Sequence, residues 1–249
     1  MTHEPSIPFS RPARALVALN AGIAWLGVAL TTVISAAGGY RESVPPVGLY
    51  GSHPDGAAGV LSRVADTLSY FTIWSNVVVA LSATLLLVRP RDHGLVARVL
   101  RLDALLMITI TAIVYQVLLA PTADVQGWSL LTDPMLHKVT PVLTVLAWVV
   151  AGPRGWVRGR LVPLALAVPL LWIAWMLVRG AVIGAYPYDF ANVSALGYGA
   201  VARTLAAILV FGLAVASLYW GLDVALGRLA RRRRTGVTSP EGRMSGSPS

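Results

Sequence analysis

The segment that decides the fold spans residues 68–88 and reads LSYFTIWSNVVVALSATLLLV. As a helix it is long enough to cross a membrane, because about 20 residues cover a hydrocarbon core of about 30 Å. Its first nine residues nevertheless carry four hydroxyl groups and one amide group. Polar side chains in a membrane segment usually face other helices or a hydrated cavity, so this polar start is the first place to look for a site.

The composition of the 249-residue chain indicates a membrane protein. Hydrophobic residues make up 56% of the chain and charged residues only 12%, whereas about 25% of an ordinary globular domain is charged. The chain contains no cysteine, which excludes a disulfide framework and a catalytic thiolate. Most of its basic residues are arginines that flank apolar runs. This pattern is typical of membrane orientation, and we expect no nucleic acid partner.

Further apolar runs predict an all-α, polytopic membrane domain over residues 15–226. We expect its six transmembrane helices at about 15–37, 68–88, 102–120, 135–151, 161–178 and 202–222. A polar segment, 1–14, precedes them, and a basic tail, 227–249, follows, whose end is rich in Ser, Gly and Pro and is expected to be disordered. A cleaved signal peptide is an alternative for the first run, although its 23 uncharged residues favour a span.

The distribution of basic residues predicts the orientation of the helices. With both termini inside the cell, the inner segments contain fifteen lysines and arginines and the outer segments five. Cytoplasmic connections typically carry such an excess, so we expect both termini in the cytoplasm. The arginine cluster in the tail then acts on orientation and lipid headgroups. The preference for arginine over lysine and the high alanine content favour a bacterial source and hence a multi-pass protein of the inner membrane.

In this topology the polar residues of the spans gather in the outer half of the membrane. Thr72, Ser75 and Asn76 lie at i, i+3 and i+4 on one face of the second span. His137 enters the fourth span at a similar level. An alternative for the small polar residues is packing between helices, which is their common use in membrane bundles. The other polar residues expected near this level are Tyr115, Gln116, Lys138, Arg179, Tyr186 and Asp189.

Thr72 and His137 form a pair with a chemical logic. A threonine hydroxyl is a weak nucleophile that needs an adjacent base, and histidine titrates in the right range. Asp133 or Asp189 would orient the imidazole ring from its other side. Ester chemistry also requires a donor for the oxyanion. The candidates for this donor are Asn76, Ser75, Tyr186 and Lys138, and the sequence does not choose among them.

We expect neither a metal nor another cofactor. His53 and His93 fall on opposite sides of the membrane in this topology, and few carboxylates lie near His137 in the sequence. The sequence makes no prediction of the oligomeric state.

Three motifs together resemble a known family. They are residues 70–76 (YFTIWSN), 136–143 (LHKVTPVL), and 179–181 (RGA) followed by 186–190 (YPYDF). This set is similar to that of the androgen-induced protein family, including its bacterial branch, and the resemblance extends over the six spans in order. Animal members are six-pass membrane hydrolases that cleave fatty-acid esters of hydroxy fatty acids with a threonine nucleophile and a histidine. The resemblance implies these two roles for Thr72 and His137.

The leading hypothesis is therefore an intramembrane hydrolase in which Thr72 attacks a lipid ester at the outer leaflet and His137 takes up the proton. Membrane lipids are its expected partners and the source of its substrate. A non-catalytic membrane scaffold is one alternative, for which Gly212 and Ala216 lie at packing spacing on the last span. A transporter or channel for a small lipophilic or anionic solute is another. Its outer vestibule would be lined by Thr72, Asn76, Tyr115, Gln116 and Arg179.

Overall fold

The computed structural model describes residues 10–40, 45–90, 92, 94–121, 123 and 125–236. All regular elements in these ranges are helical. The predictions for the first nine residues and for 237–249 lie outside the described residues. The α-helices are α1 (Arg11–Ala36), α2 (Val60–Thr67), α3 (Phe71–Val88), α4 (Leu95–Val114), α5 (Ser129–Pro134), α6 (Thr140–Ala151), α7 (Ala167–Ile183) and α8 (Val193–Gly236).

Six helical stretches are long and apolar enough to cross a membrane, which confirms the predicted number of spans and the all-α class. Each coincides with one predicted span, but most are longer than predicted. The third begins at Leu95 and includes Arg98 and Arg101, because arginine continues a helix readily beyond the hydrocarbon. The six stretches are Arg11–Ala36, Phe71–Val88, Leu95–Leu119, Ser129–Ala151, Gly159–Ile183 and Val193–Ala230.

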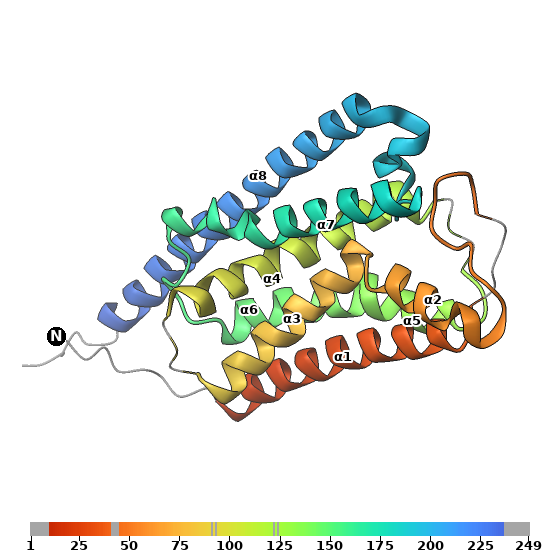
Figure 1. The fold of residues 1–249 in the computed structure, drawn as a ribbon. Coiled ribbons are helices and arrows are strands. Elements are labelled where there is room, and N and C mark those ends of the chain that lie inside the picture. Colours follow the sequence, from red (N-terminus) through yellow and green to blue (C-terminus); the bar gives the residue numbers. More distant parts are fainter. Residues whose placement is uncertain are drawn as a thin grey trace, which may run out of the picture.

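Helix α8 differs most from its prediction. It begins at Val193, is broken at Gly197 (φ 74°, ψ 160°), and reaches Gly236. The first ten residues of the tail predicted to be disordered, 227–236, are thus helical, because leucine, alanine and arginine in this stretch are good helix formers. Figure 1 shows that α8 lies obliquely across the bundle and ends at the same end of the molecule at which α1 begins.

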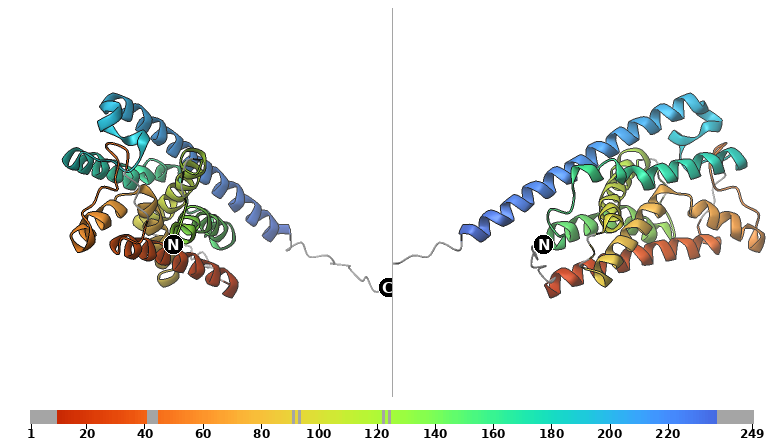
Figure 2. Two further views of the ribbon diagram at one scale, coloured as in Figure 1. Left: turned by 90° about the vertical axis from the view of Figure 1, so that its right-hand side faces the viewer. Right: turned by 60° about the vertical axis from the view of Figure 1, so that its left-hand side comes forward.

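The other helices lie roughly along one direction around α4. Helix α1 packs against α3 and α6, whereas α4 contacts α3, α6 and α8. Helices α7 and α8 cover the side of α4 that faces away from α1 (Figures 1 and 2). The short helices α2 and α5 lie together at one end of the bundle (Figure 1), which we call the α2 end. The polar starts of the second and fourth spans approach this end.

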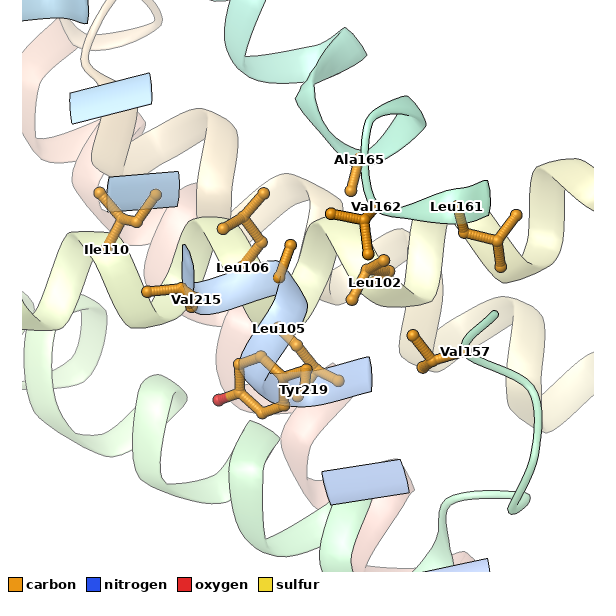
Figure 3. Close-up of a cluster of buried hydrophobic side chains, with 11 residues drawn as sticks. Leu102, Leu105, Leu106, Ile110, Val157, Leu161, Val162, Ala165, Val215 and Tyr219 are labelled. Atoms are coloured by element: carbon orange, nitrogen blue, oxygen red, sulfur yellow. The ribbon is translucent and has the colours of Figure 1, made fainter. Parts of the chain in front are cut away.

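The opposite half of the bundle is held by apolar packing. Figure 3 shows the largest cluster, in which α4 and α8 meet the connection that leads into α7. Ala216 of α8 is completely buried there. In a membrane such close packing replaces the hydrophobic effect as the force between helices. The cluster contains Leu102, Leu105, Leu106, Ile110, Val157, Leu161, Val162, Ala165, Val215, Ala216 and Tyr219.

Arg63 of α2 ties the α2 end to the end of α1. Its guanidinium donates hydrogen bonds to the carbonyls of Ser35 (3.0 Å) and Ala36 (3.1 Å), which end α1, and to the carbonyl of Gly56 (2.8 Å). The last carbonyls of a helix have no partner within the helix, so a buried arginine here stabilises both the helix end and the loop. Arg63 thereby holds α2 against the end of α1.

A second tie joins the loop before α2 to the segment between α7 and α8. Tyr50 N donates to Tyr186 O (3.1 Å), and Tyr186 N donates to Gly48 O (2.8 Å). Asn192 Nδ2 donates to Val47 O (3.0 Å). Gly48 has a φ of 80° and its Cα hydrogen faces Asn192, where a Cβ atom would lie 2.6 Å from Asn192 Oδ1. The two segments together cover the α2 end.

Candidate active site

Helix α3 begins three residues later than predicted, and this places Thr72 in its first turn. Tyr70 is extended (φ −73°, ψ 137°) and ends the connection from α2. The N–H of Phe71, which has no partner within the helix, donates to the hydroxyl of Tyr188 at 3.0 Å. Thr72 is therefore the second residue of a helix start, where the unpaired N–H groups carry partial positive charge. Its side chain is buried at 9% exposure.

His137 lies in a π-helical turn, Met135–Val139, between α5 and α6. The N–H and the hydroxyl of Thr140 both bond to the carbonyl of Met135, the latter at 2.9 Å. Pro141 follows and has no N–H to donate to the preceding turn, which favours a widened helix just before it. Such π turns are frequent at functional sites because they redirect a side chain without ending the helix.

The structure brings Thr72 and His137 into direct contact. Thr72 Oγ1 lies 3.1 Å from His137 Nε2. The other ring nitrogen, Nδ1, lies 3.1 Å from a carboxylate oxygen of Asp133 and 3.1 Å from the Asp133 carbonyl. Both of these groups only accept hydrogen bonds, so Nδ1 carries the proton and Nε2 is free to accept from the threonine. The three residues have the geometry of a nucleophile, a base and an orienting carboxylate.

Tyr115 completes the surroundings of His137. Its ring stacks on the imidazole, with centroids 3.8 Å apart and an interplanar angle of 12°. Its hydroxyl donates to the second carboxylate oxygen of Asp133 at 2.6 Å. Tyr115 opens a second π-helical turn, Tyr115–Leu119, at the end of α4. The two π turns thus hold the imidazole between a ring and a carboxylate.

A chamber of about 560 Å³ opens beside this group at the α2 end. Its wall includes Thr72, Asp133 and His137 and is mostly polar and aromatic. A narrower, apolar pocket of about 50 Å³ begins on the other side of Thr72 and lies between α4, α7 and α8. Four residues line both spaces and so mark their junction, namely Thr72, Tyr115, Leu119 and Tyr188.

Ser75 and Asn76 lie on the predicted face but support the helix from behind. Both are completely buried, and neither lines the chamber. Asn76 Nδ2 donates to Thr72 O (2.8 Å) and Leu136 O (3.3 Å), which joins the start of α3 to the turn that carries His137. Ser75 Oγ donates to Phe71 O and accepts from Thr111. Their donor groups are already used and buried, so neither is placed to donate to an oxyanion in the chamber, and the role that we expect for them as support of Thr72 stays a prediction.

The structure places the other predicted residues away from the chamber. Lys138, Gln116 and Asp189 are exposed. Tyr186 is buried, but its ring packs on Gly180 of α7 rather than on the chamber. Neither Lys138 nor Tyr186 is therefore placed to donate to an oxyanion in the chamber. Periodicity alone could not place Gln116 and Lys138, because each lies inside a π turn, where the helical period changes.

Arg179 forms an ion pair instead of lining a vestibule. Its guanidinium lies 2.5 Å from Asp66 and 4.6 Å above the ring of Tyr50. Asp66 also lies 3.5 Å from His53 Nε2 and accepts from the N–H of Gly51. The cluster fixes the loop before α2 against α7. The charge of Arg179 is balanced there by Asp66, and the residue contributes to the chamber only through this loop.

Within the part of the chain that the structure describes, no three His, Cys, Asp or Glu side chains lie close enough together to bind a metal ion. Sequence reasoning missed Tyr188, which borders both spaces; the only signal for it was its place in the motif 186–190. Comparison of the chain with family models, with curated proteins and with solved structures gives no match.

Proposed function

We propose that the protein is an intramembrane hydrolase of lipid esters, with Thr72 as the nucleophile and His137 as the general base. The observation that carries this proposal is the 3.1 Å contact between Thr72 Oγ1 and His137 Nε2. It gains weight from Asp133, whose carboxylate lies 3.1 Å from the opposite ring nitrogen. A hydroxyl that is bonded only to water or to a carbonyl would have no such chemistry.

The reaction would proceed in two steps. Thr72 Oγ attacks the ester carbonyl carbon while His137 Nε2 takes the hydroxyl proton, and the carbonyl electron pair moves to oxygen. The tetrahedral species then loses the alcohol, which leaves with the proton from His137, and an acyl-threonine remains. Water then attacks the acyl group while His137 takes a proton from it, and the second tetrahedral species expels Thr72 Oγ1, which takes this proton from His137 as the carboxylic acid is released.

The two spaces that meet at Thr72 support a substrate with one apolar and one polar part. The narrow pocket is lined almost entirely by apolar side chains of α4, α7 and α8, among them Ile110, Trp172 and Leu205. It suits an acyl chain. The chamber on the other side holds polar groups and is about ten times larger, which suits the alcohol part of a membrane lipid ester.

The location of the site and the orientation of the protein form part of the same proposal. Fifteen of the twenty basic residues fall on the side of the chain termini, so we place both termini in the cytoplasm of a bacterial cell and the site in the outer half of the inner membrane. The motifs at 70–76, 136–143 and 186–190 support membership of the androgen-induced protein family, and the contact between Thr72 and His137 is what that membership requires.

No observation specifically favours the transporter or the scaffold. Of the five residues expected to line a transport vestibule, only Thr72 and Tyr115 border the chamber. Beyond that level, buried apolar residues of α1, α3 and α4, among them Ala24, Val79 and Met107, fill the bundle. The small-residue face expected to serve a scaffold packs on α4 within the chain itself, where Ala216 is buried.

The proposal can be tested with a fluorophosphonate probe, which reacts with activated hydroxyl nucleophiles, and with p-nitrophenyl octanoate as a chromogenic ester. The purified protein in lipid nanodiscs should be labelled and should hydrolyse the ester. The variants Thr72→Ala and His137→Ala should lose both, and Thr72→Ser should retain labelling. Thr84→Ala, which removes a hydroxyl from the other end of α3, is the matched control. Equal labelling of the wild type and the two alanine variants would refute the assignment.

A further inference from the structure

The proposed reaction needs a hydrogen-bond donor for the negative charge that develops on the carbonyl oxygen. This donor must lie at the junction of the chamber and the apolar pocket, because an ester with its acyl chain in the pocket places its carbonyl beside Thr72. The residues suggested by the sequence are excluded by position: Ser75 and Asn76 are completely buried in α3 and do not line the chamber, Tyr186 packs against Gly180 of α7, and Lys138 is exposed.

Among the side chains that border both spaces, elimination leaves one candidate. Thr72 is the nucleophile itself, and Leu119 has no polar side chain. The Tyr115 hydroxyl donates to Asp133 at 2.6 Å and is thereby used. Tyr188 remains, and it borders both spaces.

The hydrogen bonding of Tyr188 leaves its own proton available. Its hydroxyl oxygen accepts the N–H of Phe71 at 3.0 Å. The backbone and the hydroxyl of Thr72 also lie within hydrogen-bonding reach of this oxygen. Because a phenol has a single hydrogen and the Phe71 contact uses only a lone pair, that hydrogen can donate to an oxygen beside Thr72. The Phe71 N–H also fixes the oxygen one residue away from the nucleophile. The hydroxyl is thus positioned by the same helix start that positions Thr72.

The ring of Tyr188 is held rigidly, as a preorganised donor requires. It stacks on Phe190 with centroids 5.0 Å apart and an interplanar angle of 7°. The ring of Tyr70 lies edge-on to it with centroids 5.7 Å apart, and the ring of Trp172 is tilted to it with centroids 6.2 Å apart. The residue as a whole is 8% exposed. Burial raises the pKa of Tyr188 to about 12, so the phenol keeps its proton throughout the physiological range.

We propose that Tyr188 is a catalytic residue that donates its hydroxyl hydrogen to the oxyanion of the tetrahedral species. This inference depends on the hydrolase proposed above. No proton is transferred in this step: as Thr72 forms its bond to the carbonyl carbon, the carbonyl π pair becomes a lone pair on oxygen, and the Tyr188 O–H bonds to it. When the alcohol leaves, the carbonyl re-forms and the bond weakens.

The test compares Tyr188→Phe with wild type on p-nitrophenyl octanoate in nanodiscs. The variant keeps the ring and its stacking, and it loses both the proposed donor and the acceptor of the Phe71 N–H. We expect kcat to fall about 100- to 1000-fold, as is usual when one oxyanion donor is removed, while KM changes less than about threefold. The rate of fluorophosphonate labelling should fall in parallel. A purely structural role would instead lower the unfolding temperature without this separation of kcat from KM.

Tyr186→Phe removes a hydroxyl two residues away and serves as the rival donor. It should retain a kcat within about threefold of wild type. Two outcomes overturn the assignment of Tyr188: a kcat of Tyr188→Phe near wild type, or an equal loss in Tyr186→Phe. In either case, the hydrolase proposal would still hold if the wild type is active and the Thr72→Ala variant is inactive. If the wild type neither hydrolyses the ester nor reacts with the probe, both proposals fail together.

Discussion

Replacing Asp133 by asparagine should lower kcat about 10- to 150-fold. The carboxylate lies 3.1 Å from His137 Nδ1, and a hydrogen bond to a charged group of this kind contributes about 1.5–3 kcal/mol. It matters most in the transition state, when the imidazole gains the proton of Thr72 and becomes positive. Each 1.36 kcal/mol corresponds to about a tenfold change in rate, which gives the stated range.

The loss should nevertheless remain well below the factor of about 10⁴ that follows a complete loss of tautomer control. The Asp133 backbone carbonyl, also 3.1 Å from Nδ1, is present in the variant and still accepts the ring N–H. Asparagine has a single side-chain oxygen, which can accept from His137 Nδ1 or from the Tyr115 hydroxyl but not from both. The base therefore keeps its correct tautomer and loses mainly the stabilisation of its charged form.

The assay is steady-state hydrolysis of p-nitrophenyl octanoate by protein in nanodiscs, with labelling by the fluorophosphonate as a second reading. Asp189→Asn makes the same chemical change in the other aspartate that the sequence offered, and Asp189 is exposed. Its kcat should stay within about twofold of wild type. An Asp133→Asn enzyme that retains its full kcat, or a similar loss in Asp189→Asn, would show that Asp133 does not hold the base.

Three further changes test other contacts. Tyr115→Phe keeps the stacked ring, but the Asp133 carboxylate loses the hydrogen bond of 2.6 Å that the Tyr115 hydroxyl donates to it. Because one hydrogen bond is lost, kcat in the ester assay should fall about 3- to 10-fold. Gly180→Ala would place a Cβ atom 2.0 Å from Cε1 of Tyr186 and should destabilise the fold by about 1–3 kcal/mol in thermal unfolding; Gly22→Ala, which has open space around it, should not. Arg63→Met should lower the free energy of unfolding by about 3 kcal/mol, because the last carbonyls of α1 lose a charged donor. A midpoint of denaturant unfolding close to that of the wild type would contradict this role.

The six spans were predictable because the hydropathy of a membrane helix is a property of composition over about 20 residues. The ends were less predictable, since they depend on single contacts. Helix α3 begins at Phe71 rather than Leu68 because the Phe71 N–H finds the hydroxyl of Tyr188, more than a hundred residues further along the chain. Helix α8 continues beyond residue 222 because its polar end consists of residues that also favour helix.

The contact between Thr72 and His137 follows from the depth of both residues in their spans, which the sequence indicates. The choice among donors does not follow from depth, because Ser75 and Asn76 share a level and a face with Thr72. The difference lies in burial: Ser75 and Asn76 are completely buried, whereas Thr72 lines two cavities. A cavity depends on side chains from several helices, and Tyr188 came from a segment that hydropathy assigns to a loop.

The two π turns explain how a bundle of ordinary helices can hold this site. The rings of Tyr115 and His137 stack with their centroids 3.8 Å apart, although the two residues belong to different spans. Each lies in a widened turn, Tyr115–Leu119 and Met135–Val139, and each turn is followed within two residues of its end by a proline. A proline lacks the N–H that would hold the previous turn to the regular pattern. Pro121 and Pro141 therefore favour the widening that turns one ring toward the other, and the resulting stack fixes the imidazole that we propose as the base for Thr72.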